Sequence, residues 1–188
     1  MKYVVLGVPL SPFVRKVRVF CAEKGIDYEL EPISPFEPPE GWREISPLGR
    51  IPVLALVDDD GSRRYLPDSS VICAFLEQMH PEPSLIPIDP IARGDALWLE
   101  EYADSELAGV IGLGIFRPVV LARLTGGEPD LAKARDTVDH RMSFVNMGHA
   151  GFAPDEKRWP RFSAFLERMH GRDSFAACIE QERRILAR

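Results

Sequence analysis

The sequence predicts a mixed α/β domain followed by an all-helical domain, and three observations support this fold class. Over residues 1–80, short apolar strands and amphipathic helices follow one another as βαβ, an irregular stretch and ββα. Residues 81–90 contain four prolines, the composition of a linker. Over residues 91–188 only helical patterns appear, at 91–108, 130–142 and 159–170.

The first half of the α/β domain carries clear start and stop signals. Residues 2–8 are β-branched and apolar and predict a buried strand. Ser11 and Pro12 predict the start of a helix, as N-cap and first helical residue, and Gly25 predicts its end. Residues 26–33 alternate well enough to predict a second strand.

The second half of this domain predicts a hairpin and a helix. Residues 51–57 are an apolar strand candidate, and the DDDG turn at 58–61 leads into RRYL. Asp68 then opens a helix in which Ile72 and Leu76 belong to one apolar face. A mixed sheet covered by two helices is therefore expected.

Composition and charge exclude several classes of partner. Hydrophobic residues make up 45% and charged residues 28% of the 188 positions, which is ordinary for a globular protein. With a net charge of −6 and no basic run, neither nucleic acid nor an anionic membrane is an expected partner. No apolar run approaches the roughly 20 residues that span a bilayer, and prolines interrupt the apolar N-terminus that a signal peptide would need.

The cysteines and histidines show no spacing typical of a metal or redox site. Cys21, Cys73 and Cys178 are far apart, so we expect reduced thiols in a cytoplasmic protein. Cys21 falls on the apolar face of the first helix and is expected in the core. The four histidines share no local spacing, and no metal site is predicted.

Ser11 is the first candidate for chemistry, because it lies between a strand and a helix in the segment SPFVRKV. A hydroxyl there can donate a hydrogen bond to a thiolate, and the first-turn amides and the helix dipole favour the same anion. These interactions lower the pKa of a thiol. The alternative is that Ser11 only caps the helix.

Two further segments carry candidate binding groups. A cis Ile51–Pro52 bond would leave the N–H and C=O of Ile51 available to a peptide-like ligand, whereas a trans proline at an edge strand is the alternative. Asp68 suits an ammonium group, and Ser69 at a helix N-terminus suits a carboxylate. The α-amino acid end of a ligand presents both groups, although a simple helix cap would also explain the pair.

Taken in order, these segments resemble the glutathione transferase superfamily. The resemblance is carried by SPFVRKV at 11–17, SPLGRIPVL at 46–54 and LPDSSVI at 66–72, and more weakly by WPRFSAFLERM at 159–169. It implies a thioredoxin-like N-terminal domain that binds glutathione and a helical C-terminal domain that supplies the second-substrate pocket. Among members, the chain looks like the serine-type, bacterial-like ones.

The resemblance also implies a role for each matching residue. Ser11 would be the catalytic hydrogen-bond donor to the glutathione sulfur. Ile51, beside a cis Pro52, would bond the cysteinyl backbone, and Arg50 could approach the glycine carboxylate. Asp68 and Ser69 would hold the γ-glutamyl end.

One departure from the family pattern falls in the helical domain. Members usually have a Ser/Thr-x-x-Asp capping box that opens a buried central helix, and this chain has none. A segment is therefore expected to be absent near Arg141–Met142. Either the protein has truly lost this segment, or the sequence omits it and joins the residues on its two sides. We favour omission, because loss of a core helix should unfold a small helical domain.

The function expected from the resemblance is activation of the glutathione thiol for attack on a small electrophile. Glutathione acts as co-substrate, no other cofactor is expected, and a cytoplasmic homodimer is implied. One alternative is a non-catalytic interaction module on the same fold, as in the gamma subunit of the translation elongation factor or the stringent starvation regulator. The other is a glutathione-dependent isomerase or dehalogenase with a different helical pocket.

Overall fold

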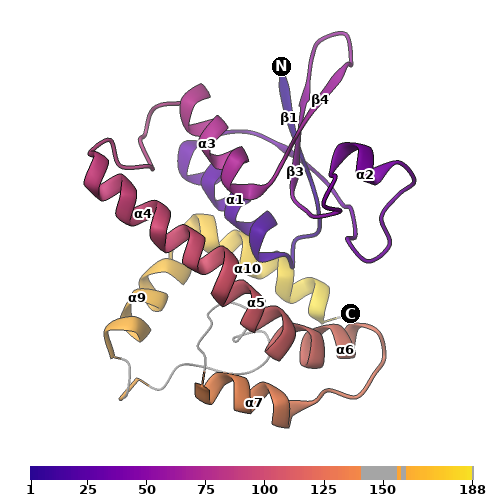
Figure 1. Ribbon diagram of the computed structural model, residues 1–188, viewed down its shortest axis with the longest axis vertical. Helices are drawn as coiled ribbons and strands as arrows, with labels where there is room; N and C mark the ends of the chain where they lie inside the picture. Colours follow the sequence, from indigo (N-terminus) through magenta and orange to yellow (C-terminus); the bar gives the residue numbers. More distant parts are fainter. Residues whose placement is uncertain (141–155, 158–159, 188) are drawn as a thin grey trace. The chain divides into compact units, whose positions relative to one another are not determined.

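The computed structural model describes residues 1–140, 156–157 and 160–187, and divides into two compact units, Met1–Pro87 and Ile88–Arg188. The boundary falls inside the predicted linker. The expected missing segment near Arg141–Met142 lies outside the described residues. Figure 1 shows the elements in chain order.

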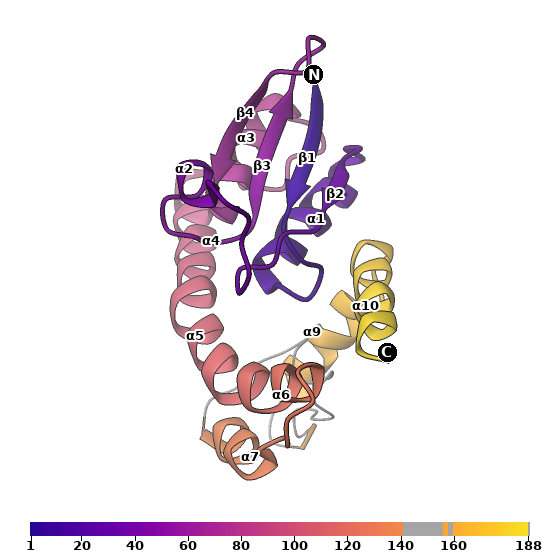
Figure 2. The ribbon, with the colours of Figure 1, turned by 90° about the vertical axis from the view of Figure 1, so that its right-hand side faces the viewer.

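Unit 1 is a four-stranded mixed sheet of order β2-β1-β3-β4 with two packed helices. β1 is parallel to β2 and antiparallel to β3, which is antiparallel to β4. Figure 2 shows the strands side by side. Its elements are β1 (Lys2–Leu6), α1 (Pro12–Lys24), β2 (Glu29–Glu31), α2 (Trp42–Ile45), β3 (Val53–Val57), β4 (Arg63–Pro67) and α3 (Ser69–Met79).

The predicted order of elements in unit 1 is confirmed, with two differences in detail. The strand expected over 26–33 is limited to three residues, because β2 is an edge strand that pairs with β1 alone. The irregular stretch before β3 contains one helical turn, α2, whose Trp42 is buried in the core. The core itself is the apolar face of the sheet packed against Val14, Val17, Ile72 and Leu76.

The described residues of unit 2 form helices and the turns that connect them. The helix predicted over 91–108 is much longer and runs without a break from Pro90 to Leu124. Gly112, Gly114 and Pro118 lie beyond the predicted end at residue 108, and a π-helical stretch accommodates them within the helix. The described elements are α4 (Pro90–Tyr102), η1 (Ala103–Leu107), α5 (Ala108–Ile111), η2 (Gly112–Leu121), α6 (Ala122–Leu124), α7 (Leu131–His140), α9 (Pro160–His170) and α10 (Asp173–Leu186).

The long helix also corrects one sequence expectation. By length and composition alone it could cross a membrane, whereas no segment was expected to be apolar enough. Its leucines, isoleucines and valines keep the hydropathy high, although glycines divide them into short runs. Ile115, Val119 and Val120 are buried, but only 22% of the apolar stretch is, and a single helix of this kind is weak evidence for a membrane span.

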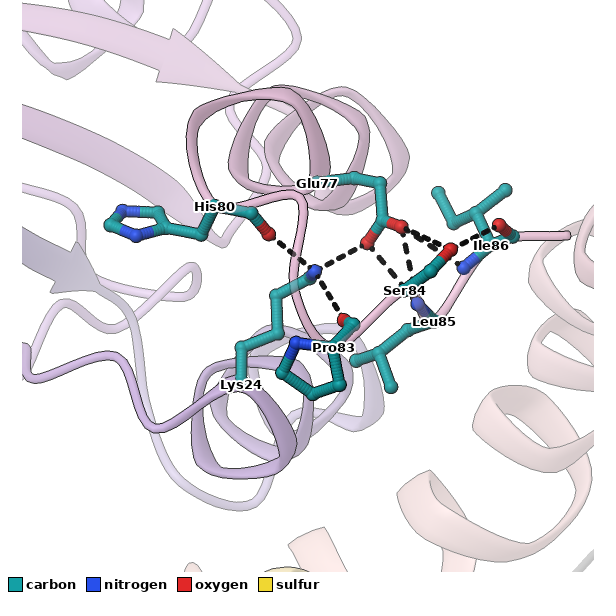
Figure 3. Close-up of polar contacts among 7 residues, drawn as sticks. All are labelled: Lys24, Glu77, His80, Pro83, Ser84, Leu85 and Ile86. Carbon is teal, nitrogen blue, oxygen red and sulfur yellow. Dashed lines mark hydrogen bonds and ion pairs between the residues drawn. The ribbon is translucent and has the colours of Figure 1, made fainter. Parts of the chain in front are cut away.

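A buried ion pair joins the C-terminal ends of α1 and α3 (Figure 3). The Nζ of Lys24 lies 2.7 Å from Oε2 of Glu77, and the Lys24 side chain is fully buried. The same ammonium donates hydrogen bonds to the carbonyl oxygens of His80 at 2.6 Å and Pro83 at 2.8 Å. All three N–H donors of Lys24 are therefore used.

Glu77 binds the other side of the same segment. Its Oε1 accepts hydrogen bonds from the Ser84 hydroxyl at 3.2 Å and from the amides of Leu85 at 3.1 Å and Ile86 at 3.3 Å. Figure 3 shows how the pair holds the chain between His80 and Ile86. The start of the proline-rich segment is thus fastened to unit 1.

Removal of the Lys24 ammonium should destabilise unit 1. Lys24→Met leaves the partly buried Glu77 without its cation, so we expect the free energy of unfolding in urea to fall by about 2 kcal/mol. Lys2→Met is the matched control, since Lys2 is exposed on β1 and its loss should change stability by less than about 0.5 kcal/mol. Equal losses in both variants would contradict this role of the ion pair.

The same network predicts a dependence of stability on pH. Burial raises the pKa of Glu77, but hydrogen bonds from Lys24, Ile86, Leu85 and Ser84 outweigh it and hold the pKa below its ordinary value. The stabilisation is complete above the unfolded-state pKa of about 4.3 and is lost as the pH falls through the lower folded-state pKa. The stability difference between wild type and Glu77→Gln should therefore shrink below pH of about 4 in urea titrations. A constant difference would contradict it.

Candidate functional site

The sheet register brings all the predicted binding segments to one edge of unit 1. Leu6 at the end of β1 pairs with Val53 at the start of β3, and Val53 pairs with Pro67 at the end of β4. Neighbouring strands lie about 4.8 Å apart. The residues just outside these strand ends, on the β1–α1 loop, at Pro52 and at Asp68, are therefore neighbours in space.

Ser11 is the N-cap of α1, as predicted. Its backbone is extended, with φ −69° and ψ 126°, and its Oγ accepts a hydrogen bond from the Val14 amide at 3.4 Å. A serine hydroxyl has one donor and two acceptor lone pairs. Capping therefore occupies a lone pair and leaves the O–H able to donate, so the cap and a thiolate contact are compatible.

Gly7 packs closely at the same edge, and the sequence analysis missed it. A Cβ at Gly7, where φ is 153°, would lie 2.5 Å from Cγ2 of Val14 and 3.3 Å from Cβ of Ile51. The end of β1, the first turn of α1 and the Ile51 loop thus meet at one point. A glycine directly after an apolar strand can indicate such a close backbone approach.

The Ile51–Pro52 peptide bond is cis, which confirms that expectation. Both residues are buried, and Pro52 leads directly into β3. Among the described residues, no group bonds to the backbone N–H or C=O of Ile51. These two groups are arranged as an open strand edge would be.

Asp68 and Ser69 form the start of α3, as predicted. Oδ1 of Asp68 accepts hydrogen bonds from the amides of Ser70 at 2.9 Å and Val71 at 3.2 Å. Asp68 has φ 83°, the only positive φ found at a non-glycine residue in the described chain. Such strain is typical of functional sites, where it costs about 1–3 kcal/mol. Ser69 is 3% exposed.

The N-terminal ends of α1 and α3 are joined directly. Nζ of Lys16 donates to Oγ of Ser70 at 3.0 Å. Because Lys24 and Glu77 join the opposite ends, the two helices run parallel. Their positive dipole ends therefore face the same edge of the sheet, which favours an anion there.

The remaining predicted residues take simpler positions. The Arg50 side chain is exposed, beside the Ile51 loop. Cys21 is buried in the core, where burial raises the pKa of its thiol to about 12, so it is not a nucleophile. The described residues contain no group of three ligating side chains suited to a metal ion.

Unit 2 contains a separate pocket of about 780 Å³ between the long helix and α7. Its walls include Val110 and Leu113 on the apolar side and Glu106 and Asp136 on the polar side. None of the predicted site residues lines it.

Comparison with known proteins identifies the family of unit 1 and the fold of the chain. Residues 5–84 match the family model described as glutathione S-transferase, N-terminal domain. A crystal structure of a glutathione S-transferase from Rhodospirillum rubrum F11 has 26% sequence identity and a TM-score of 0.78, over 94% of this chain and 91% of that one.

Curated relatives match over shorter stretches. The uncharacterized GST-like protein YibF of Escherichia coli K12 is 29% identical over 143 residues, 75% of this chain and 67% of that protein. The stringent starvation protein A homolog of Haemophilus ducreyi is 39% identical over 82 residues, 44% of this chain and 36% of its own length. The second match thus spans only about a third of that relative.

The family match falls on the unit that carries the Ser11, Ile51 and Asp68 edge, and the similarity to solved structures extends over both units. Residues 5–84 therefore form a domain of the glutathione S-transferase N-terminal family, and the chain as a whole resembles solved glutathione transferases.

Proposed function

We propose that unit 1 binds glutathione and holds its sulfur as a thiolate for attack on a small electrophile. The observation that carries this proposal is the meeting of three recognition groups at one sheet edge: Ser11 on α1, Ile51 before a cis proline, and Asp68 with Ser69 on α3. A thiol tripeptide with one amino acid end presents chemistry complementary to all three.

Each group has a distinct part in this proposal. The N–H and C=O of Ile51 bond the cysteinyl unit as an added strand would. The first-turn amides of α3 and the Ser69 hydroxyl hold the γ-glutamyl carboxylate, and the Asp68 carboxylate pairs with the ammonium group. The exposed guanidinium of Arg50 pairs with the glycine carboxylate.

Ser11 supplies the activation. Its O–H donates to the sulfur, while the parallel N-terminal ends of α1 and α3 add positive potential at the same edge. Lowering a thiol pKa by two units requires about 2.7 kcal/mol. A hydrogen bond to a charged group contributes about 1.5–3 kcal/mol, which is sufficient with the helix dipole. Positioning then directs the thiolate at the electrophile, and the proposal requires no metal or redox cofactor.

A non-catalytic interaction module is the second candidate, because the match to the stringent starvation protein A homolog covers the same unit. Calorimetric titration with glutathione separates the two. Binding at millimolar or lower concentration supports the proposal, whereas no heat of binding would overturn it in favour of the module. A cytoplasmic homodimer remains part of the proposal, to be checked by sedimentation.

Replacement of Ser11 should affect thiolate formation more than folding. Ser11→Ala removes the donor to sulfur, and the lost cap costs about 1 kcal/mol of stability. We expect the ultraviolet thiolate absorbance of bound glutathione at neutral pH to fall and kcat to drop about tenfold or more. Ser11→Thr retains the hydroxyl and is the control. Unchanged thiolate absorbance in Ser11→Ala would remove Ser11 from the mechanism.

Asp68 can be tested without loss of its structural role. Asp68→Asn retains the N-cap and tolerates the positive φ, but removes the charge that pairs with the ammonium group. The Kd for glutathione should rise about tenfold, the value of one charge-assisted hydrogen bond.

Asp89→Asn is the matched control for this charge. Asp89 caps α4 in unit 2 through the same oxygen, with bonds of 3.1 Å to Ile91 and 2.9 Å to Ala92. Its replacement should leave the Kd unchanged. Equal affinities of the two variants would disprove the ammonium contact at Asp68.

A further inference from the structure

Ser46 closes the loop between α2 and β3 that carries Arg50 and Ile51. It is 1% exposed, and its carbonyl oxygen accepts a hydrogen bond from the Gly49 amide at 2.7 Å. Gly49 has φ 67°, a conformation that favours glycine. The chain from Ser46 to Gly49 is therefore a tight turn, with Pro47 at the position that proline prefers.

The Ser46 hydroxyl then binds both backbone groups of one residue. Its Oγ donates to the Arg50 carbonyl at 2.8 Å and accepts from the Arg50 amide at 3.1 Å. Arg50 thus has its N–H and C=O satisfied inside the loop. Ile51 is the next residue, and its backbone N–H and C=O have no partner among the described residues.

The Ser46 hydroxyl thus makes a bonded peptide group at Arg50, and the unbonded groups of Ile51 follow directly. Without the Ser46 hydroxyl, the amide and carbonyl of Arg50 would have to bond water. The turn from Ser46 to Gly49 would remain, held by its backbone bond and by the bond from Arg43 to the Pro47 carbonyl, but nothing would fix the peptide of Arg50 beyond it. The open groups of Ile51 and the guanidinium of Arg50 would then lose their common orientation. The fixed end at Pro52, buried in unit 1, cannot alone determine both.

We propose that Ser46 is a positioning residue of the glutathione site. It holds the peptide of Ile51 for the cysteinyl backbone and the side chain of Arg50 for the glycine carboxylate. This inference rests on the proposed function. In this inference Ser46 positions the groups that bind the ligand backbone. It takes no part in the activation of sulfur, which is the role of Ser11.

Ser46→Ala tests the assignment through a separation of affinity from thiol activation. The loss of two hydrogen bonds should raise the Kd and KM for glutathione about tenfold. At saturating glutathione, kcat and the pKa of the bound thiol should match wild type, because Ser11 and the end of α1 are unaltered. Ser46→Thr retains the hydroxyl and should restore the affinity.

Two further variants serve as a substitute and as a control. Ser46→Cys fills the same space with a thiol that bonds weakly, so it gives the same readout if the alanine variant does not fold. Ser163→Ala removes a buried hydroxyl from unit 2 that has no hydrogen-bond partner within the described part of the chain. Its Kd should equal that of wild type.

The outcomes distinguish this inference from the proposed function. Failure of the wild type to bind glutathione would overturn the proposed function, and the inference with it. Wild-type affinity in both Ser46→Ala and Ser46→Cys would overturn the inference alone. A raised thiol pKa together with the weaker affinity would also overturn it, because Ser46 would then support the whole site rather than the backbone contacts.

Discussion

The close contact at Gly7 is the constraint on which the site depends. The end of β1, the first turn of α1 and the Ile51 loop approach so closely that a methyl group at Gly7 would lie 2.5 Å from Val14. The hydroxyl of Ser11 and the open peptide of Ile51 are fixed relative to each other by this contact. The parallel α1 and α3, joined by Lys16 and Ser70 at one end, add the third group. In the proposed function, activation and recognition therefore share one packed corner of the sheet.

The structure removes an apparent conflict about Ser11. From the sequence, a helix cap and a thiolate donor are competing interpretations. The observed bond from the Val14 amide uses an oxygen lone pair, and donation to a sulfur uses the hydrogen. Asp68 is similar, because both of its capping bonds go to Oδ1 and Oδ2 can contact a ligand. Each residue can complete its helix and still contact a ligand, so a capping role is no argument against a binding role.

Local patterns predicted most of unit 1 but less of unit 2. Ser11, Gly25 and Asp68 gave correct helix boundaries because caps depend on a few neighbouring residues. The long helix through Pro118 was underestimated, since its breakers are tolerated by π-helical turns that no short pattern reveals. Gly7 and Ser46 were missed because their roles depend on contacts with residues brought close by folding. The position of Pro52 in the sequence did not determine whether its peptide bond is cis or trans, and in the structure it is cis.

The ion pair of Lys24 and Glu77 has a consequence for where this chain can be divided. Proline-rich composition suggests a loose tether that can be cut anywhere, yet the peptide groups of Pro83, Leu85 and Ile86 are ligands of the buried pair. A fragment that ends at Met79 would lack these partners and expose the lysine and the carboxylate to solvent on that side. If unit 2 is exchanged for the helical domain of a relative, the junction should therefore lie at Pro87. Unit 1 then keeps the segment from His80 to Ile86 that binds the ion pair.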